Sequence, residues 1–304
     1  MFIETGAGLV RWVLASWVMC VALISVVDGV LGQDHRAVEY GLPKKLAKLT
    51  DERINEASGM ARCLARPGTF WVHNDSGGQP RLFLIDQTGK TLGVVKLKGA
   101  SCVDWEDLCS FEIAGEKMLL VGDIGDNLRR RKTCTLYLIR EPRLPPNLPA
   151  EVSVLRTIEF TYDDGPHDCE AIAVDPQRQE ILLITKSVTE AVRAYTLPLK
   201  PQGRGRLQAK SLRQLTMPSV SGMDISPDGQ RLVVLQYVTA SEIRRRQDET
   251  WAAALRRAPR VIRLPPQRQC ESICFGHDGR SLFSVSEGYF QPLWKIPVAT
   301  STSE

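Results

Sequence analysis

Five short segments of this chain resemble one another, and their spacing constrains the fold more than any other feature. Each has an acidic residue near the start of a strand-like stretch: Glu56, Glu106, Glu170, Asp224 and Glu271. Successive acidic residues are 50, 64, 54 and 47 positions apart. Repeats of about 40 to 50 residues that each contain several strands are typical of a β-propeller. The sequence therefore predicts an all-β propeller with five blades, and six blades are the alternative.

The strand-like segments between these points fit four strands per blade. The last repeat contains three such segments, whereas residues 37–50 precede the first repeat and have no other role. We expect this N-terminal segment to supply the missing strand and close the ring, because closure removes two exposed sheet edges. In the fourth repeat, residues 240–257 have a helix-like spacing of apolar residues and an alanine-rich run, which predict an inserted helix.

The N-terminus has the pattern of an export signal. Residues 12–27 form an apolar run broken by two serines, and Arg11 precedes it. The run is shorter than the roughly 20 residues of a transmembrane helix, and Gly32 suits a cleavage position. We expect residues 1–32 to be a signal peptide, or an N-terminal membrane anchor if they are not cleaved. Residues 33–304 then form a single propeller domain that is periplasmic, envelope-associated or secreted.

Composition excludes some partners. The net charge is +4 over 304 residues, which gives no sign of nucleic-acid binding. Seven cysteines follow the signal segment, and an odd number leaves at least one thiol free or intermolecular. No Cys-x-x-Cys spacing supports a zinc ribbon or a redox motif. We expect a monomer that binds a small molecule or a protein at its channel mouth and touches the membrane only through an uncleaved N-terminus.

The repeated acidic residues are the candidate site. Innermost strands line the channel of a propeller, so polar groups that recur there converge on one axis. A second polar series ends the second strands: Asp75, Asp123, Lys186, Gln236 and Glu287. Further acidic residues lie nearby: Asp104, Asp107, Asp126 and Asp168. So many carboxylates must pair with cations, bind a metal or remain protonated.

A hard cation is a direct way to satisfy such a site, and Ca²⁺ takes six to eight oxygen ligands. The segment from Asp123 to Asn127 places several oxygens on one loop, although it lacks the spacing of an EF-hand. The predicted metal ligands are Glu106, Asp107, Asp123, Asp126 and Asn127. Other ligand-binding candidates are Glu56, Asp75, Asp104, Asp224, Glu271 and Glu287. The catalytic candidates are Glu170, Lys186 and His167, the last as a general base. The alternative is that these carboxylates join blades by accepting backbone hydrogen bonds.

Several motifs together resemble a family of exported bacterial propellers that is loosely related to phytase-like, WD40-like and TolB-like propellers. They include Trp71–Gly77, Asp104–Asp107, Gly122–Asn127, Glu170-Ala171 and Ser286–Gly288. The resemblance covers nearly the whole chain after the signal segment. It implies an envelope or secreted propeller and no particular reaction.

Three functions remain open at this point. The first is a binding or scaffold propeller with Ca²⁺ as a structural ion. The second is a metal-dependent hydrolase of phosphoesters or related anions, with Glu170 as a base and Lys186 on an anionic oxygen. The third is a glycosidase that uses Glu106, Glu170 and Glu271.

Overall fold

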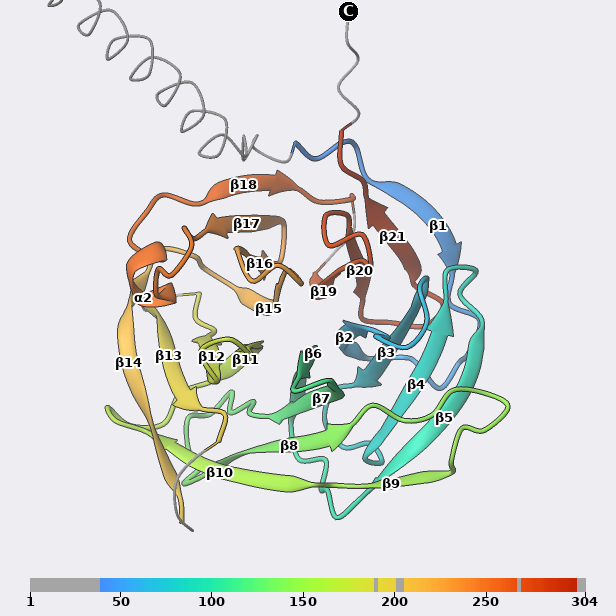
Figure 1. The fold of residues 1–304 in the computed structure, drawn as a ribbon, viewed down its shortest axis with the longest axis horizontal. Helices are drawn as coiled ribbons and strands as arrows, with labels where there is room; N and C mark the ends of the chain where they lie inside the picture. Colours follow the sequence, from blue (N-terminus) through green and yellow to red (C-terminus); the bar gives the residue numbers. More distant parts are fainter. Residues whose placement is uncertain (1–38, 189–190, 201–204, 267–268, 300–304) are drawn as a thin grey trace, which may run out of the picture. The chain divides into compact units, whose positions relative to one another are not determined.

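The computed structural model describes residues 39–188, 191–200, 205–266 and 269–299. The predicted signal segment lies outside these residues. Within them, antiparallel pairing groups the strands into sets of four, which Figure 1 shows arranged around a centre. The first set is β2 (Ala57–Arg62), β3 (Thr69–Asn74), β4 (Arg81–Asp86) and β5 (Thr91–Lys98). A short strand, β9 (Glu151–Ser153), extends its outer edge in parallel with β5.

The other four sets follow in chain order. The second is β6 (Trp105–Ile113), β7 (Glu116–Asp123), β8 (Cys134–Arg140) and β10 (Arg156–Tyr162). The third is β11 (Cys169–Asp175), β12 (Glu180–Thr185), β13 (Val192–Pro198) and β14 (Leu207–Leu215). The fourth is β15 (Val220–Ile225), β16 (Arg231–Gln236), β17 (Thr239–Arg244) and β18 (Arg260–Arg263). The last is β19 (Cys270–Phe275), β20 (Leu282–Ser286), β21 (Pro292–Ile296) and β1 (Lys44–Lys48).

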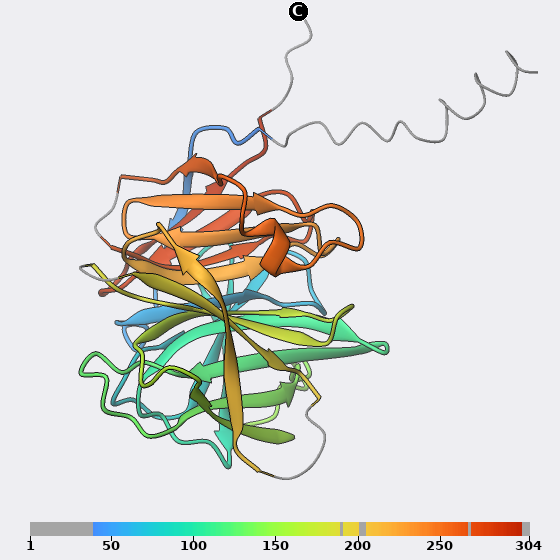
Figure 2. The same ribbon diagram turned by 90° about the vertical axis from the view of Figure 1, so that its left-hand side faces the viewer.

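The ring is closed as the sequence predicts. Strand β1 pairs antiparallel with β21, so the N-terminal strand completes the last blade. The first strands of the sets contact one another in the order β2, β6, β11, β15, β19 and back to β2. These five strands are therefore the innermost ones, and Figure 2 shows the blades stacked side by side when the ring is turned by 90°.

Apolar layers between neighbouring blades hold the ring together. Each pair of neighbours shares one buried cluster, for example Trp71 and Leu84 of blade one with Trp105 and Leu119 of blade two. Equivalent clusters lie between blades two and three, three and four, four and five, and five and one. Since strands buried on both faces need apolar side chains at successive positions, second strands contain continuous hydrophobic runs, such as Ile181–Ile184 and Leu232–Leu235.

The predicted inserted helix was mostly wrong. Thr239–Arg244 forms the third strand of blade four and pairs with both β16 and β18. The helix is limited to α2 (Trp251–Ala254), capped by the Thr250 side chain, which accepts from the Ala253 N–H. The blade needs a strand between β16 and β18, and this long-range pairing overrides the local helical spacing of residues 240–244.

Candidate functional site: an acidic mouth of the channel

Every innermost strand carries a β-bulge near its first residue. The pairing register skips one residue in each blade, and the skipped residues are Ser58, Glu106, Glu170, Ser221 and Glu271. A bulge leaves its extra residue out of the ladder and redirects its side chain. The equivalent positions are therefore three glutamates and two serines. The expected equivalence of Glu56 and Asp224 with the three glutamates was wrong.

Two further positions repeat around each bulge. The residue two places before the bulge is Glu56, Asp104, Asp168, Ser219 or Gln269. The residue that follows the second strand is Asp75, Ile124, Lys186, Tyr237 or Glu287. In the first four blades a backbone hydrogen bond joins these two positions, as between the Lys186 N–H and the Asp168 carbonyl at 2.9 Å. This hydrogen bond holds the start of the first strand and the end of the second strand together at one end of the channel.

The carboxylates at these positions form a cluster that we call the acidic mouth. It consists of Asp75, Asp104, Glu106, Asp168, Glu170, Glu271 and Glu287. One oxygen from each of Asp75, Asp104 and Glu106 lies within 4.8 Å of the others, and the same holds for Glu106, Asp168 and Glu170. Glu106 belongs to both sets. Ligands on opposite sides of a Ca²⁺ ion at about 2.4 Å are about 4.8 Å apart, so each set suits one cation.

Lys186 is the cation that contacts a carboxylate of the acidic mouth directly, whereas Arg131 and Arg129 act electrostatically on Asp104 and Asp168. The Lys186 Nζ lies 2.9 Å from Glu170 Oε1 and 5.1 Å from the centre of the Tyr237 ring. Burial lowers the pKa of Lys186, but Glu170, Tyr237 and Glu271 together outweigh burial and raise this pKa, so the lysine stays charged. One ammonium group offsets only part of the charge of seven carboxyl groups.

Burial and mutual repulsion shift the pKa values of the carboxyl groups upward. Burial raises the pKa of Glu271 to about 8 and that of Glu170 to about 7, although Lys186 opposes both shifts. Burial also raises the pKa of Asp75 and of Asp104 to about 6. The pKa of Glu106 is raised well above its usual range by burial and by the neighbouring Glu170. Without a bound cation, the mouth therefore holds protons near neutral pH.

A glycine makes room for two of these carboxylates. A Cβ atom at Gly125 would lie 2.1 Å from Glu106 Oε1 and 2.5 Å from Asp104 Oδ2. Contacts that short do not occur for real side chains, so no larger residue fits there without moving the two carboxylates. Gly125 thus lets Asp104 and Glu106 approach the same point from one side, and the oxygen set fits a hard cation.

The predicted metal-binding loop, from Asp123 to Asn127, stabilises the acidic mouth through hydrogen bonds. Asp123 accepts from Arg131 at 2.8 Å and from the N–H groups of Val103 and Asp104. The Asp126 carboxylate accepts from the N–H groups of Arg130 and Arg131, and its own N–H donates to Asp168 Oδ1 at 2.9 Å. The Asn127 side chain is exposed. The structure does not bring Asp123, Asp126 or Asn127 into the two oxygen sets.

Asp107 and Asp224 lie deeper and join blades. Asp107 Oδ2 accepts from the N–H of Ile172 at 2.8 Å and from that of Met223 at 3.1 Å, so it ties blade two to blades three and four. Asp224 accepts from Arg62 Nη1 at 3.0 Å and from the N–H of Phe275 at 2.9 Å. Both carboxyl groups thus have the blade-joining contacts that the alternative interpretation expects.

The remaining candidates lie at the edge of the mouth or away from it. Glu56 is exposed and lines a surface groove with Glu287 and Trp294. His167 Nε2 lies 2.8 Å from both Asp164 Oδ1 and the Tyr195 hydroxyl, and its ring packs on Tyr162. This aromatic cluster lies where the end of β10 pairs with β14 of blade three. None of the contacts described for His167 reaches Glu170.

Sequence reasoning missed the role of Asp168. The sequence predicts Asp168 only as an additional acidic residue near the channel, yet Asp168 completes one of the two oxygen sets. The signal was present, because Asp104-Trp105-Glu106 and Asp168-Cys169-Glu170 share one Asp-x-Glu spacing. The seven cysteines of the described residues lie outside disulfide bonds, and Cys102 alone among them is not fully buried.

Comparisons with known proteins give the fold class. Neither protein-family models nor curated protein sequences gave a match. The PQQ-bound aldose sugar dehydrogenase (Adh) of Streptomyces coelicolor superposes with a TM-score of 0.50 and 11% identity, covering 86% of this chain and 100% of that one. The Dos1 propeller gives a TM-score of 0.38 and 11% identity over 79% of this chain and 68% of that one, which is too distant to support an argument.

The chain is therefore a β-propeller, as the sequence predicts, and the comparison extends to the fold alone. The resemblance to exported bacterial propellers stays a prediction. Within the described ranges, no helix is both long enough and apolar enough to cross a membrane.

Proposed function

We propose that the protein is an exported binding propeller whose acidic mouth holds a divalent cation, with Ca²⁺ as the first choice, and presents it to a ligand. The observation that carries this proposal is the pair of oxygen sets around Glu106, made of five carboxylates. Oxygen-only donor sets favour Ca²⁺ or Mg²⁺ over metals that prefer nitrogen and sulfur. The groups that would hold the ion are Asp75, Asp104, Glu106, Asp168 and Glu170.

The raised pKa values give this proposal a measurable consequence. A cation binds the ionised carboxylates, so groups that hold a proton near neutral pH must release it. Glu170, with a pKa of about 7, and Glu106, with a pKa well above its usual range, are the expected proton sources. Binding of Ca²⁺ should therefore release protons and strengthen as the pH rises from about 6 to about 8.

The test is calorimetric titration of the full chain with CaCl₂ at pH 7 in two buffers of different ionisation enthalpy. We expect saturable binding, a heat that differs between the buffers because of released protons, and a higher melting temperature with Ca²⁺. MgCl₂ is the comparison cation. No saturable heat with either cation would overturn the proposal and leave the carboxylates as blade-joining groups.

One feature favours a metal-dependent hydrolase as the second candidate. The two oxygen sets share Glu106, so two cation positions would be neighbours bridged by one carboxylate. Paired cations in hydrolases stabilise the attacking and leaving oxygens of phosphoesters. Lys186 would then contact an anionic substrate oxygen. Release of p-nitrophenol from its phosphate mono- or diester, dependent on the cation and lost in Glu170→Gln, would support this candidate, whereas no turnover with Ca²⁺, Mg²⁺ or Mn²⁺ would exclude it for these esters.

A further inference from the structure

The opposite end of the channel contains a cavity that the acidic mouth does not involve. Its volume is about 390 Å³, within the range of small-molecule sites. Four innermost strands contribute to it from their later residues, among them Arg62 of β2, Phe111 of β6, Val174 of β11 and Ile225 of β15. The acidic mouth lies at the first residues of the same strands, so the two sites are separated by the length of the channel.

The lining of this cavity is apolar on its walls and polar at a few points. Leu64, Phe111, Val174 and Ile225 supply hydrocarbon surface. Polar groups come from a larger set: Arg62, Ser110, Glu112, Gln177, Ser226 and His277. An apolar body with a few fixed polar groups is the usual composition of a site for a small organic ligand.

Arg62 is the charged group that distinguishes this cavity. Its side chain is 6% exposed, and Nη1 donates to Asp224 at 3.0 Å. This bond uses one of the five N–H groups that a guanidinium carries. The remaining N–H groups can donate to a carboxylate, and such charge-assisted hydrogen bonds are strong where water is excluded.

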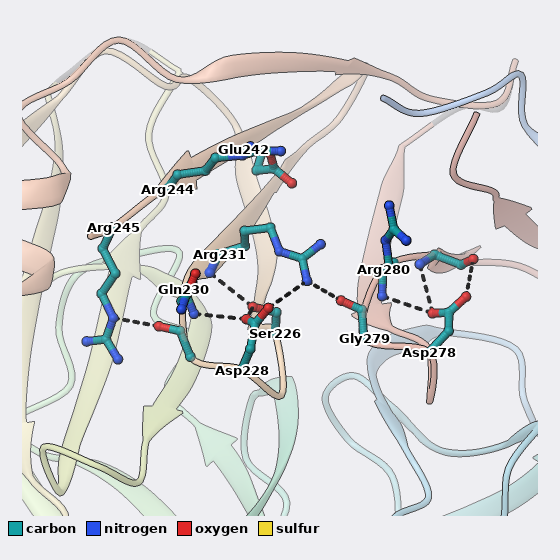
Figure 3. A network of polar contacts seen from close by, with 12 residues as sticks. Ser226, Asp228, Gln230, Arg231, Glu242, Arg244, Arg245, Asp278, Gly279 and Arg280 are labelled. Carbon is teal, nitrogen blue, oxygen red and sulfur yellow. Dashed lines mark hydrogen bonds and ion pairs between the residues drawn. The ribbon is translucent and has the colours of Figure 1, made fainter. Parts of the chain in front are cut away.

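The other arginines near the cavity are already engaged, as Figure 3 shows. Arg231 donates to Asp228 at 3.1 Å and to the Gly279 carbonyl, and Arg245 donates from Nε to the Gly229 carbonyl and pairs with Asp175. These bonds fix the turn at residues 226–229, which forms one wall of the cavity. The wall is therefore preorganised. The charges of these two arginines are compensated by Asp228 and Asp175, as that of Arg62 is by Asp224, but only Arg62 lines the cavity.

Ser110 adds a second polar group. It lines the cavity, is 4% exposed, and its Oγ has no hydrogen-bond partner among the described residues. A buried hydroxyl without a partner loses its hydration without compensation.

We propose that this cavity is a second binding site, for a small organic carboxylate. The carboxylate would meet Arg62, and the hydrocarbon body would lie against Phe111, Val174 and Ile225. A single guanidinium with Asp224 beside it favours a monoanion over a dianionic phosphate, since the aspartate repels additional negative charge. This site is independent of the cation proposed for the acidic mouth.

The test compares ligands of the same shape that differ in charge. The full chain is titrated with benzoate, hexanoate and 4-phenylbutanoate, each beside its uncharged amide, with binding followed by ligand-observed NMR. We expect at least one acid to bind, and to bind about tenfold or more tightly than its amide. Failure of all three acids to bind, or equal binding of acid and amide, would overturn the proposal.

Variants locate the site and keep the test decisive if Arg62 is needed for folding. Gln177→Trp, an exposed rim position, should block acid binding, whereas the matched surface change Gln208→Trp on β14 should not. Asp224→Asn keeps the guanidinium and removes the competing carboxylate, so it should tighten acid binding. Arg62→Met should abolish the preference for acid over amide. Unchanged binding in Gln177→Trp would overturn the assignment to this cavity.

Discussion

Lys186 Nζ lies 2.9 Å from Glu170 Oε1, and this pair is the point at which the chain itself neutralises part of the acidic mouth. The two residues are neighbours because the bulge redirects Glu170 while Lys186 follows the second strand of the same blade. Arg131 and Arg129 stabilise the charges of Asp104 and Asp168 in part, and the remaining charge of the mouth requires bound protons or a cation.

The first prediction concerns Glu106, the residue common to both oxygen sets. Glu106→Gln removes a charge and one anionic ligand from each set, so the affinity for Ca²⁺ should fall about tenfold or more, as calorimetry would measure. Glu159→Gln, an exposed change on β10, should leave the affinity unchanged. Equal affinity in the two variants would contradict the assignment.

The second prediction concerns Lys186. Lys186→Met removes a cation that competes with Ca²⁺, so the affinity for Ca²⁺ should rise. The cation-free protein should become less stable by about 1.5–3 kcal/mol, because Glu170 loses a charged hydrogen-bond partner. Urea unfolding without Ca²⁺ and calorimetry with it would measure the two effects. Lys210→Met, on the exposed side of β14, is the control and should alter neither. A loss of Ca²⁺ affinity in Lys186→Met would show that the lysine supports the site rather than competing with the ion.

The third prediction is the pH dependence of stability without Ca²⁺. Glu170 and Glu271 have folded-state pKa values of about 7 and about 8, and Asp75 and Asp104 of about 6. Carboxyl groups of an unfolded chain titrate near about 4. The folded protein thus holds more protons than the unfolded chain in this window, so stability should fall as the pH rises from about 4 to about 8.

Melting temperatures at pH 5 and pH 8 would measure this effect. Saturating Ca²⁺ should reduce the difference between them, since the bound ion stabilises the ionised carboxylates. A cation-free protein that is more stable at pH 8 than at pH 5 would mean that these groups are already ionised in the folded state.

The fourth prediction concerns Gly125. Gly125→Ala places a methyl group within contact of Glu106 Oε1 and Asp104 Oδ2, so these carboxylates must separate and the affinity for Ca²⁺ should fall. The matched change is Gly78→Ala, where the nearest atom to an added Cβ is 4.0 Å away. Calorimetry of both variants distinguishes the two positions, and equal Ca²⁺ affinity in them would argue against the proposed ligand arrangement.

The fifth prediction concerns Asp107, which we assign to blade joining and not to metal binding. Its carboxylate accepts from the N–H groups of Leu108, Ile172 and Met223. Asp107→Asn leaves at least one of these buried donors without an acceptor, so the free energy of unfolding should fall by about 1–3 kcal/mol.

Urea unfolding measures this loss. Asp163→Asn is the control, since that exposed carboxylate accepts from one N–H, of Ser211, and its change should cost less than about 0.5 kcal/mol. A stable Asp107→Asn variant that has lost Ca²⁺ affinity would reverse the assignment.

The blades could be predicted because their signals are local. Turn residues such as those at 226–229 and apolar runs such as Leu232–Leu235 mark the strands within a few residues, and their recurrence marks the propeller. The helix expected at residues 240–257 failed because part of that segment pairs with two neighbouring strands, and this pairing is not visible in local spacing.

The site was predicted in part. Glu106, Glu170 and Glu271 were placed at equivalent positions correctly, whereas Glu56 and Asp224 were aligned with them incorrectly. In the second series, Asp123 and Gln236 precede the equivalent position by one residue. A shift of one residue moves a side chain to the other face of a strand. A small error in aligning the repeats therefore predicts the wrong environment for a carboxylate.

The sequence by itself determined the β-propeller, its repeat and its closure by an N-terminal strand, because alternation, turns and period are properties of short segments. Only the tertiary structure decided which acidic side chains meet. Bulges set the register of each inner strand, and the ring brings together residues such as Glu106 and Glu170 that are far apart in the chain. The physical reason is that backbone pairing across strands, and not the identity of a residue, fixes where a side chain points.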